Sequence, residues 1–324
     1  GAMTRHSEIY SRICKTLLSL WIAFAPSFGL SEEVDSTLVF IDTTHDAVSQ
    51  RILSLSNRLD SFFGDPRIDD ETNNTRIRLF NETFFRESDG PINTTGYRIQ
   101  LKLPRTERRL QLVVSRDDDD EDNDSNSPNQ ANLRATQTNN RSEQTNAGLR
   151  YLLDLWDIRF SSDLGLSVSE WPPAVFGRLR ARKRVRLGEW VFRPAQIFRW
   201  QDRIGWTSQT NGDLDRRIND DWLFRLDNRL DWAEEDGIYN LQTGPVFLHK
   251  VSDSIAMNYS AKAYLEDEPS WAVNNYSVSI NFRQLLYKEW FFWQIGPYLN
   301  FPREDDFHRT PGATIKFEAI FGRI

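Results

Sequence analysis

The chain has 324 residues, which is enough for one large domain or two small ones. Its charged fraction of 27% excludes a bundle of membrane-spanning helices, because no window of the sequence holds the ~18 apolar residues that such a helix needs. The net charge of −7 includes an acidic run over 117–122, which argues against nucleic-acid binding, so we expect no nucleic-acid partner.

Aromatic residues make up 13% of the chain and include 11 Trp and 21 Phe, a high content for so polar a sequence. A transmembrane β-barrel reconciles these two properties, because alternate residues of each strand face lipid while the others face a polar interior. The composition therefore favours an all-β membrane protein, and a soluble all-β protein is the alternative.

The first 31 residues are predicted to target the chain rather than to fold with it. Gly1-Ala2-Met3 is interpreted as a cloning remnant. A basic stretch, the apolar run 17–24 and small residues around Gly29 and Ser31 then follow in the order of a secretory signal peptide, and a short buried helix is the alternative. Since Cys14 is the only cysteine, removal of this segment leaves no thiol, and we expect no disulfide, cofactor or metal site.

Residues 32–72 are predicted to form a periplasmic segment that contains one amphipathic helix. Apolar residues recur at helical spacing between 46 and 63, and the predicted helix face comprises Val48, Ile52, Leu55, Leu59 and Phe62. Gly64 and Pro66 end the helix after about five turns. The sequence leaves three places open for it: on the membrane surface, in or over the periplasmic mouth of the barrel as a plug or cap, or against a partner or a second copy of itself.

Residues 73–324 show the pattern of an outer-membrane β-barrel, with alternating segments of about ten residues separated by turn residues. We predict an antiparallel up-and-down barrel of fourteen strands at 75–87, 96–103, 108–117, 147–153, 157–169, 174–186, 190–202, 204–217, 222–233, 237–249, 253–266, 273–286, 290–299 and 311–321. Tight connections alternate with longer ones, as periplasmic turns and external loops do in such barrels. Twelve strands is the alternative, because Pro194 and Asn211-Gly212 interrupt the pattern.

The segment 222–232 is the clearest predicted strand. Trp stands at both ends of one face, with apolar residues between them, which is typical of the aromatic girdles of membrane barrels. Asn228 is the one polar residue on this lipid-facing side. The opposite face is predicted to line the lumen with Arg225, Asp227, Arg229 and Asp231.

The stretch 117–146 is rich in Asp, Asn, Ser, Gln and Arg and nearly free of apolar residues. Such a segment buries too little surface to order itself, so it is predicted to be a disordered acidic external loop. Its acidic run binds divalent cations in one interpretation and is simply solvated in the other.

An alternating series of arginines marks the strand predicted at 174–186. These residues share one face and must point inward, because an Arg at the midplane of the lipid face costs ~2–4 kcal/mol. The predicted luminal series is Arg178, Arg180, Arg182, Arg184 and Arg186. Candidate counter-charges are Glu82, Asp213, Asp215, Asp227 and Asp231. Three interpretations stay open: a bracing network of ion pairs, an anion path, or a site for a phosphate-bearing lipid or the neighbouring helix.

Four short motifs resemble those of a poorly characterised proteobacterial outer-membrane barrel family. They are Phe62-Phe63-Gly64-Asp65 at the end of the helix, Thr106-Glu107-Arg108-Arg109, Arg178-Leu179-Arg180-Ala181-Arg182, and Phe301-Pro302-Arg303-Glu304-Asp305-Asp306-Phe307. The resemblance implies a Gram-negative outer-membrane location and the barrel fold, and it implies no activity.

The histidines do not form a catalytic pattern. His249 is expected at a periplasmic turn and His308 in an external loop beside Asp305 and Asp306, so these two lie at opposite ends of the barrel. A hydrolytic site at the outer rim around His308 is the minor alternative. We therefore predict that the chain is not an enzyme.

Two functions remain from the sequence. The first is a channel or transporter for small or anionic solutes, with an arginine-lined lumen gated or plugged by the N-terminal helix. The second is a closed structural or assembly barrel whose helix binds a periplasmic partner or lipid. Expected partners in either case are outer-membrane lipid and lipopolysaccharide, the barrel-assembly machinery, and a periplasmic partner or second copy that contacts the helix.

Overall fold

The computed structural model describes residues 54–63, 75–87, 90–103, 109–116, 145–168, 171–288 and 290–322. The predicted signal peptide, the first part of the predicted helix with Val48 and Ile52, and the acidic stretch 117–144 lie outside these residues. Residues 54–63 form an α-helix, which confirms the second half of the predicted one. No helix in the described ranges is long and apolar enough to cross a membrane.

The rest of the described chain is almost entirely β-strand. The strands are β1 (Arg76–Arg86), β2 (Ile92–Lys102), β3 (Leu110–Arg116), β4 (Thr145–Leu155), β5 (Ile158–Val168), β6 (Ala174–Lys183), β7 (Val185–Leu187), β8 (Trp190–Gln201), β9 (Gly205–Arg217), β10 (Trp222–Ala233), β11 (Tyr239–Lys250), β12 (Ile255–Glu266), β13 (Ala272–Tyr287), β14 (Phe291–Pro302) and β15 (Thr310–Gly322). A 3₁₀ turn, η1 (Arg303–Asp305), precedes β15.

Strands β6 and β7 are two halves of one crossing strand, because both pair with β8 in one continuous register. Arg182 lies opposite Ala195 and Val185 opposite Phe192, which places Lys183 opposite Pro194. Proline has no N–H to donate, so the ladder is interrupted at this point. The sheet therefore crosses fourteen times, as predicted, and the twelve-strand alternative is wrong.

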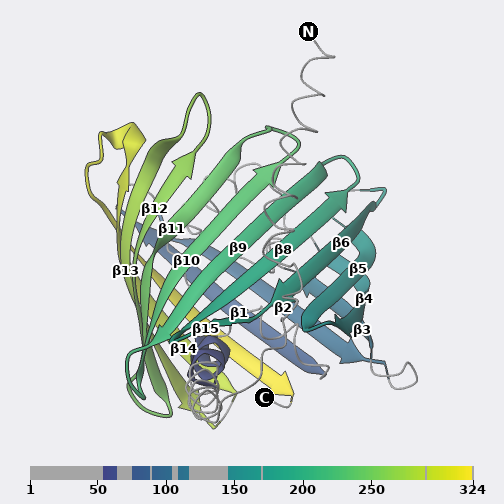
Figure 1. Cartoon of the computed structure of the whole chain (residues 1–324), viewed down its shortest axis with the longest axis horizontal. Coiled ribbons are helices and arrows are strands. Elements are labelled where there is room, and N and C mark those ends of the chain that lie inside the picture. Colours follow the sequence, from purple (N-terminus) through teal and green to yellow (C-terminus); the bar gives the residue numbers. More distant parts are fainter. Residues whose placement is uncertain are drawn as a thin grey trace, which may run out of the picture. The chain divides into compact units, whose positions relative to one another are not determined.

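The sheet closes on itself as an antiparallel up-and-down barrel (Figure 1). Strands that follow one another in the sequence are paired, except that β6 pairs with β8 across the break before β7. The first strand, β1, pairs with the last, β15. Closure removes every free strand edge, which is the condition for a β-sheet to lie in hydrocarbon. The largest error in a predicted boundary is at β2, which begins at Ile92 rather than at 96.

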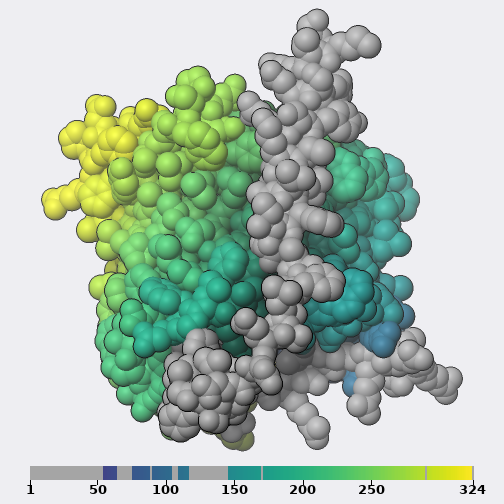
Figure 2. Space-filling view, viewed as in Figure 1, coloured from purple at the N-terminus to yellow at the C-terminus, as the bar shows by residue number. Residues whose placement is uncertain are grey.

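Alternation along the strands separates an apolar outer face from a polar inner face. Outward side chains are apolar and exposed, among them Leu79, Leu101, Leu149, Leu164, Val175, Leu179, Tyr276, Val278, Ile280 and Phe317. In the space-filling view, atoms of the strands coloured green to yellow pack side by side on one part of the face (Figure 2). Exposed apolar residues outside and polar residues inside reverse the pattern of a soluble protein and give the construction of an outer-membrane β-barrel.

The outward-facing Asn228 on β10 is compensated by hydrogen bonds within the wall. Its Nδ2 donates to the carbonyl oxygen of Gly212 at 2.9 Å, and its Oδ1 accepts from Thr243 Oγ1 at 2.7 Å. Both contacts lie on neighbouring strands, β9 and β11. A polar side chain can face lipid at modest cost when its donors and acceptors are already paired.

The lengths of the described connections distinguish the two ends of the barrel, although the three-residue turn between β8 and β9 lies at the end with the longer connections. At one end the turns are tight: two residues join β4 to β5 and β7 to β8, and four residues join β9 to β10 and β11 to β12. The long segment between β3 and β4 leaves from the other end. By the rule for outer-membrane barrels, the end with tight turns is periplasmic. The helix of residues 54–63, dark purple in Figure 1, contacts strands at this end.

Candidate functional site

The inner face of the barrel carries an excess of basic side chains. Among the described residues of the strands, nine buried side chains are basic and six are acidic. The basic ones are Arg76, Arg78, Arg98, Arg150, Arg180, Arg225, Lys262, Arg283 and Lys316, and the acidic ones are Glu82, Asp163, Asp213, Asp215, Asp227 and Glu318. Basic groups therefore outnumber acidic ones among the buried side chains of the described strands.

The predicted arginine series begins in β6 and ends in β7. Arg180 is buried at 2% exposure, Arg178 and Arg182 are half-buried, and Arg186 is exposed near the tight-turn end. Arg184 donates to Asn57 Oδ1 of the helix at 3.2 Å. The series thus extends from the interior of the barrel to the helix. This fits the interpretation in which the arginines hold the neighbouring helix.

The acidic partner of Arg178 was not among the candidates chosen from the sequence. Arg178 Nε donates to Asp163 Oδ2 on neighbouring strand β5 at 2.9 Å. Arg150 on β4 binds the same carboxylate with two hydrogen bonds, Nε to Oδ1 at 2.8 Å and Nη2 to Oδ2 at 2.9 Å. One carboxylate therefore holds two arginines and ties three adjacent strands together.

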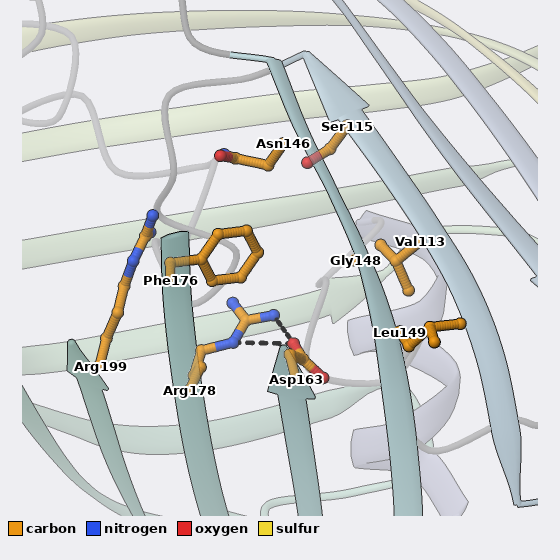
Figure 3. Close-up of a pocket in the computed structure, with 9 residues that line it drawn as sticks. All are labelled: Val113, Ser115, Asn146, Gly148, Leu149, Asp163, Phe176, Arg178 and Arg199. Carbon is orange, nitrogen blue, oxygen red and sulfur yellow. Dashed lines mark hydrogen bonds and ion pairs between the residues drawn. The ribbon is translucent and has the colours of Figure 1, made fainter. Parts of the chain in front are cut away.

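A small pocket opens beside the ion pair of Asp163 and Arg178 (Figure 3). Its lining includes Ser115, Asn146, Phe176, Arg178 and Arg199, and the guanidinium of Arg199 lies 5.1 Å from the centre of the Phe176 ring. The pocket has a volume of about 20 Å³, which is room for a water molecule rather than for an organic solute.

The four luminal residues predicted on β10 do point inward, but they do not act as one group. Arg225 and Asp227 are buried, and Asp227 Oδ2 accepts from Lys262 Nζ at 2.6 Å. Arg229 Nε binds Asp231 on the same strand at 2.7 Å. Arg225 instead joins a cluster with the helix.

The helix packs its apolar side on inward-facing residues near the tight-turn end. Leu55, Leu59 and Phe63 are buried in one cluster with a docking patch on the wall. The docking patch consists of Val191 on β8, Leu223 on β10, Val246 and Leu248 on β11, and Ala256 on β12. Leu59 is exposed by only 1%, and burial of one such side chain contributes about 1.5–3 kcal/mol.

Of the predicted helix face, Leu55 and Leu59 are confirmed, and Phe62 lies at the edge of the buried face. Phe62 is only half-buried, and its ring meets that of Phe292 on β14 edge to face, with 5.7 Å between the centroids. Phe63, rather than Phe62, belongs to the buried face, with 3% of its surface exposed. The spacing Leu55, Leu59, Phe63 is four residues each time, whereas the predicted stripe placed Phe62 three residues after Leu59.

Beside the apolar contact lies a buried ionic group, which we call the Asp60 cluster: Ser56 and Asp60 on the helix, Arg193 on β8, Asp215 on β9 and Arg225 on β10. Arg225 Nη1 and Nη2 donate to the two oxygens of Asp60 at 2.8 and 2.9 Å. Arg193 Nη1 donates to Asp60 Oδ2 at 2.7 Å. Two guanidinium groups face two carboxylates, so the cluster is neutral.

Hydrogen bonds within the Asp60 cluster leave its members well satisfied. Ser56 Oγ donates to Asp215 Oδ2 at 2.7 Å and accepts from Arg193 Nη1 at 2.7 Å. Arg225 also holds Asp215, with Nε to Oδ1 at 2.7 Å. A buried charge is tolerated only when it is paired in this way.

Sequence reasoning missed Ser56, Asp60 and Arg193, although two signals pointed to them. Ser56 and Asp60 are four residues apart and lie next to Leu55 and Leu59, so they border the apolar stripe on one side of the helix. Arg193 follows inward-facing Val191 at the two-residue period of a strand.

A second ionic group joins the first and last strands of the barrel. Glu318 on β15 accepts hydrogen bonds from Arg78 on β1 and from Arg283 on β13. The guanidinium of Arg283 also lies 4.5 Å from the centre of the Phe292 ring. One carboxylate thus binds two buried guanidinium groups beside the β1–β15 pairing.

We expect Glu318→Gln to destabilise the whole barrel, because two buried guanidiniums lose their carboxylate. Removing one partner of a buried ion pair costs about 3–5 kcal/mol. The measurement is the urea midpoint of unfolding in lipid vesicles, followed by Trp fluorescence. Glu235→Gln, at an exposed position in the β10–β11 connection, is the control. Equal midpoints for the two variants would show that the Glu318 group contributes nothing to stability.

His308 lies in the connection before β15 and makes no catalytic arrangement. It is exposed, and its Nδ1 contacts the carbonyl oxygen of Asp305 at 2.7 Å. Within the described ranges, no three His, Cys, Asp or Glu side chains are grouped so that they could hold a metal ion. The absence of enzyme activity stays a prediction.

Comparison with known proteins adds little beyond this geometry. No protein-family model matches the sequence, and no curated protein matches it. Similar solved structures include the outer-membrane expressed OmpT of Vibrio cholerae, with 9% identity over 76% of this chain and 97% of that chain and a TM-score of 0.46. The outer membrane channel DcaP of Acinetobacter baumannii has 8% identity over 76% of this chain and 96% of that chain, with a TM-score of 0.40. At these identities and scores, the likeness says nothing about what this chain does.

Proposed function

We propose that this chain is a bacterial outer-membrane channel for small anionic solutes and that the helix of residues 54–63 closes its periplasmic end. The observation that carries the proposal is the place of the helix. Its buried face packs on inward-facing residues of four strands, from Val191 on β8 to Ala256 on β12, rather than on the lipid-facing side of the wall.

The width of the barrel supports a transport role. Barrels of about eight strands are filled by their own side chains, whereas those of about sixteen leave an aqueous channel. With fourteen crossing strands, this barrel lies close to the second class. A helix that occupies one end supplies a closure that the side chains of so wide a barrel do not provide alone.

The basic excess in the lumen supports anions as the solute class. Basic side chains along a pore attract anions and repel cations, as rings of positive charge do in anion-selective channels. Arg180 and the half-buried Arg178 and Arg182 lie on one inner face of β6, and Arg184 follows toward the helix. This arrangement is a path of positive charge that ends at the proposed closure.

We expect Arg180→Glu together with Arg182→Glu to reverse the preference for anions. The change replaces two positive charges with two negative ones on the same inner face, so the reversal potential in a salt gradient should shift toward the cation value. The measurement is made in a variant whose helix is undocked, so that current flows. The neutral double variant Arg180→Gln and Arg182→Gln should give an intermediate reversal potential. The control is Arg216→Gln, at an outward-facing position, which should leave the reversal potential unchanged. An unchanged reversal potential in all of them would contradict an arginine-lined anion path.

A second candidate is a closed structural or assembly barrel whose helix serves a periplasmic partner. The observation that favours it is the burial of large luminal side chains: Arg150 and Arg180 are exposed by 0% and 2%. Conductance in planar bilayers separates the two. A folded protein that stays silent after its helix is released is a closed barrel, and steady current from the released form supports the channel.

A further inference from the structure

The carboxylate of Asp60 is held by the barrel wall as a bound ligand would be. Three guanidinium N–H groups from two strands converge on its two oxygens, at 2.7 to 2.9 Å. Arg225 grips it with a two-pronged fork, the geometry that proteins use to recognise planar carboxylates. Asp60 itself is exposed by only 3%.

The wall holds this donor set in place without help from Asp60. Arg225 is fixed by Asp215, through Nε to Oδ1 at 2.7 Å and Nη2 to Oδ2 at 3.0 Å. Arg193 Nη1 also reaches Asp215 Oδ2, at 3.1 Å. If the helix leaves, Arg225 Nη1 and Nη2 and Arg193 Nη1 lose Asp60 as an acceptor and stay aimed at the place where its carboxylate was.

We propose that Arg193 and Arg225 form a binding site for the carboxylate of a transported solute, and that Asp60 occupies this site as an internal substitute. The inference rests on the proposed function, since the helix must leave before a solute enters. Docking of the helix and binding of a carboxylate solute then exclude each other, so the solute itself favours the open state.

The chemistry of the contact suits such an exchange. A hydrophilic solute cannot replace Leu59 in its apolar contact with the docking patch, because it has no apolar group to bury there. A buried ion pair adds little net stability over an apolar contact of the same shape, because desolvation offsets the attraction. It does, however, give a site that another carboxylate can fill with the same hydrogen bonds.

The test compares the full-length wild type with Asp60→Ala, in sodium acetate and in sodium chloride at equal ionic strength. Acetate is the small-molecule analogue of the Asp60 side chain, because both are a carboxylate on a single carbon. In the wild type it competes with Asp60, so we expect the open fraction in planar bilayers to rise with acetate. In Asp60→Ala the two arginines can bind acetate in the docked and in the released state alike, so we expect acetate to raise the thermal midpoint and to leave the open fraction unchanged.

The signature of the site is an open fraction that rises with acetate in the wild type and does not respond to acetate in Asp60→Ala. A ligand at ten times its dissociation constant multiplies the population of the state that it binds by about ten. Asp236→Ala, at an exposed position between β10 and β11, should respond as the wild type does. An open fraction that does not rise with acetate in the wild type, or that rises equally in Asp60→Ala, would overturn the proposal. A response of the wild type to inorganic phosphate and not to acetate would overturn the choice of carboxylate. Failure of the channel function would instead appear as silence in a variant that releases the helix without touching this site.

Discussion

Leu59→Asp should open the barrel. Leu59 is exposed by 1% and packs with Leu55 and Phe63 on the docking patch. Truncation of a buried Leu costs about 2–5 kcal/mol, and the new carboxylate adds the cost of burying a charge among apolar residues. Because the change falls on the helix and leaves every strand residue in place, the docked state should be lost while the barrel stays folded. The measurement is single-channel conductance of the full chain in planar bilayers, where we expect steady current from Leu59→Asp and little current from the wild type.

The control for this experiment is Ser54→Asp, which adds the same charge to the exposed side of the same helix. It should conduct as the wild type does. Heat-modifiable gel mobility shows in each case that the barrel is folded. If Leu59→Asp is folded, its helix amides exchange freely with solvent and current is still absent, then the helix does not close the lumen and the channel proposal is wrong.

The fold was predictable because its information is local. Each strand carries its own alternation, so the faces of β10 follow from the period of two, and Leu223, Arg225 and Asp227 are found inward as expected. The alternation persists through Pro194, which interrupts the ladder without shifting the register, and this is why the number of crossings survived the break. The helix was equally visible, because Leu55 and Leu59 stand at helical spacing.

The site was less predictable because it depends on pairings between distant parts of the chain. Asp60 and Arg225 are 165 positions apart, and their contact requires both the closure of the barrel and the docking of the helix. The partner of Arg178 was missed for another reason. Counter-charges were sought among acidic residues elsewhere in the lumen, whereas the contact is made by Asp163 directly across the ladder on β5. Cross-strand neighbours are within reach of one another wherever register places them opposite, so the register decides the pair.

The apolar contacts and the Asp60 cluster play different parts in holding the helix. Leu55, Leu59 and Phe63 supply attraction that is insensitive to salt and to the chemistry of a solute. The ionic contacts fix orientation, since a carboxylate held by the fork of Arg225 and by one N–H of Arg193 accepts only one placement. A helix held by both is therefore bound in a defined position, yet part of its binding remains open to competition by other anions.

The coupling between Asp60 and Arg225 should be large enough to measure by a double-mutant cycle. Asp60→Ala leaves two guanidiniums with one carboxylate, and Arg225→Ala leaves two carboxylates with one guanidinium, so each alone should weaken helix docking by about 3–5 kcal/mol. The double variant is neutral again, and its loss should be smaller than the sum by on the order of 1–3 kcal/mol. Hydrogen exchange of the amides of residues 54–63 reports the free energy of local opening. Asp60→Ala combined with Arg203→Ala, an exposed residue in the turn at the far end of β8, should be additive. Additivity for the Asp60 and Arg225 pair as well would mean that the fork contact seen in the structure does not hold the helix in place.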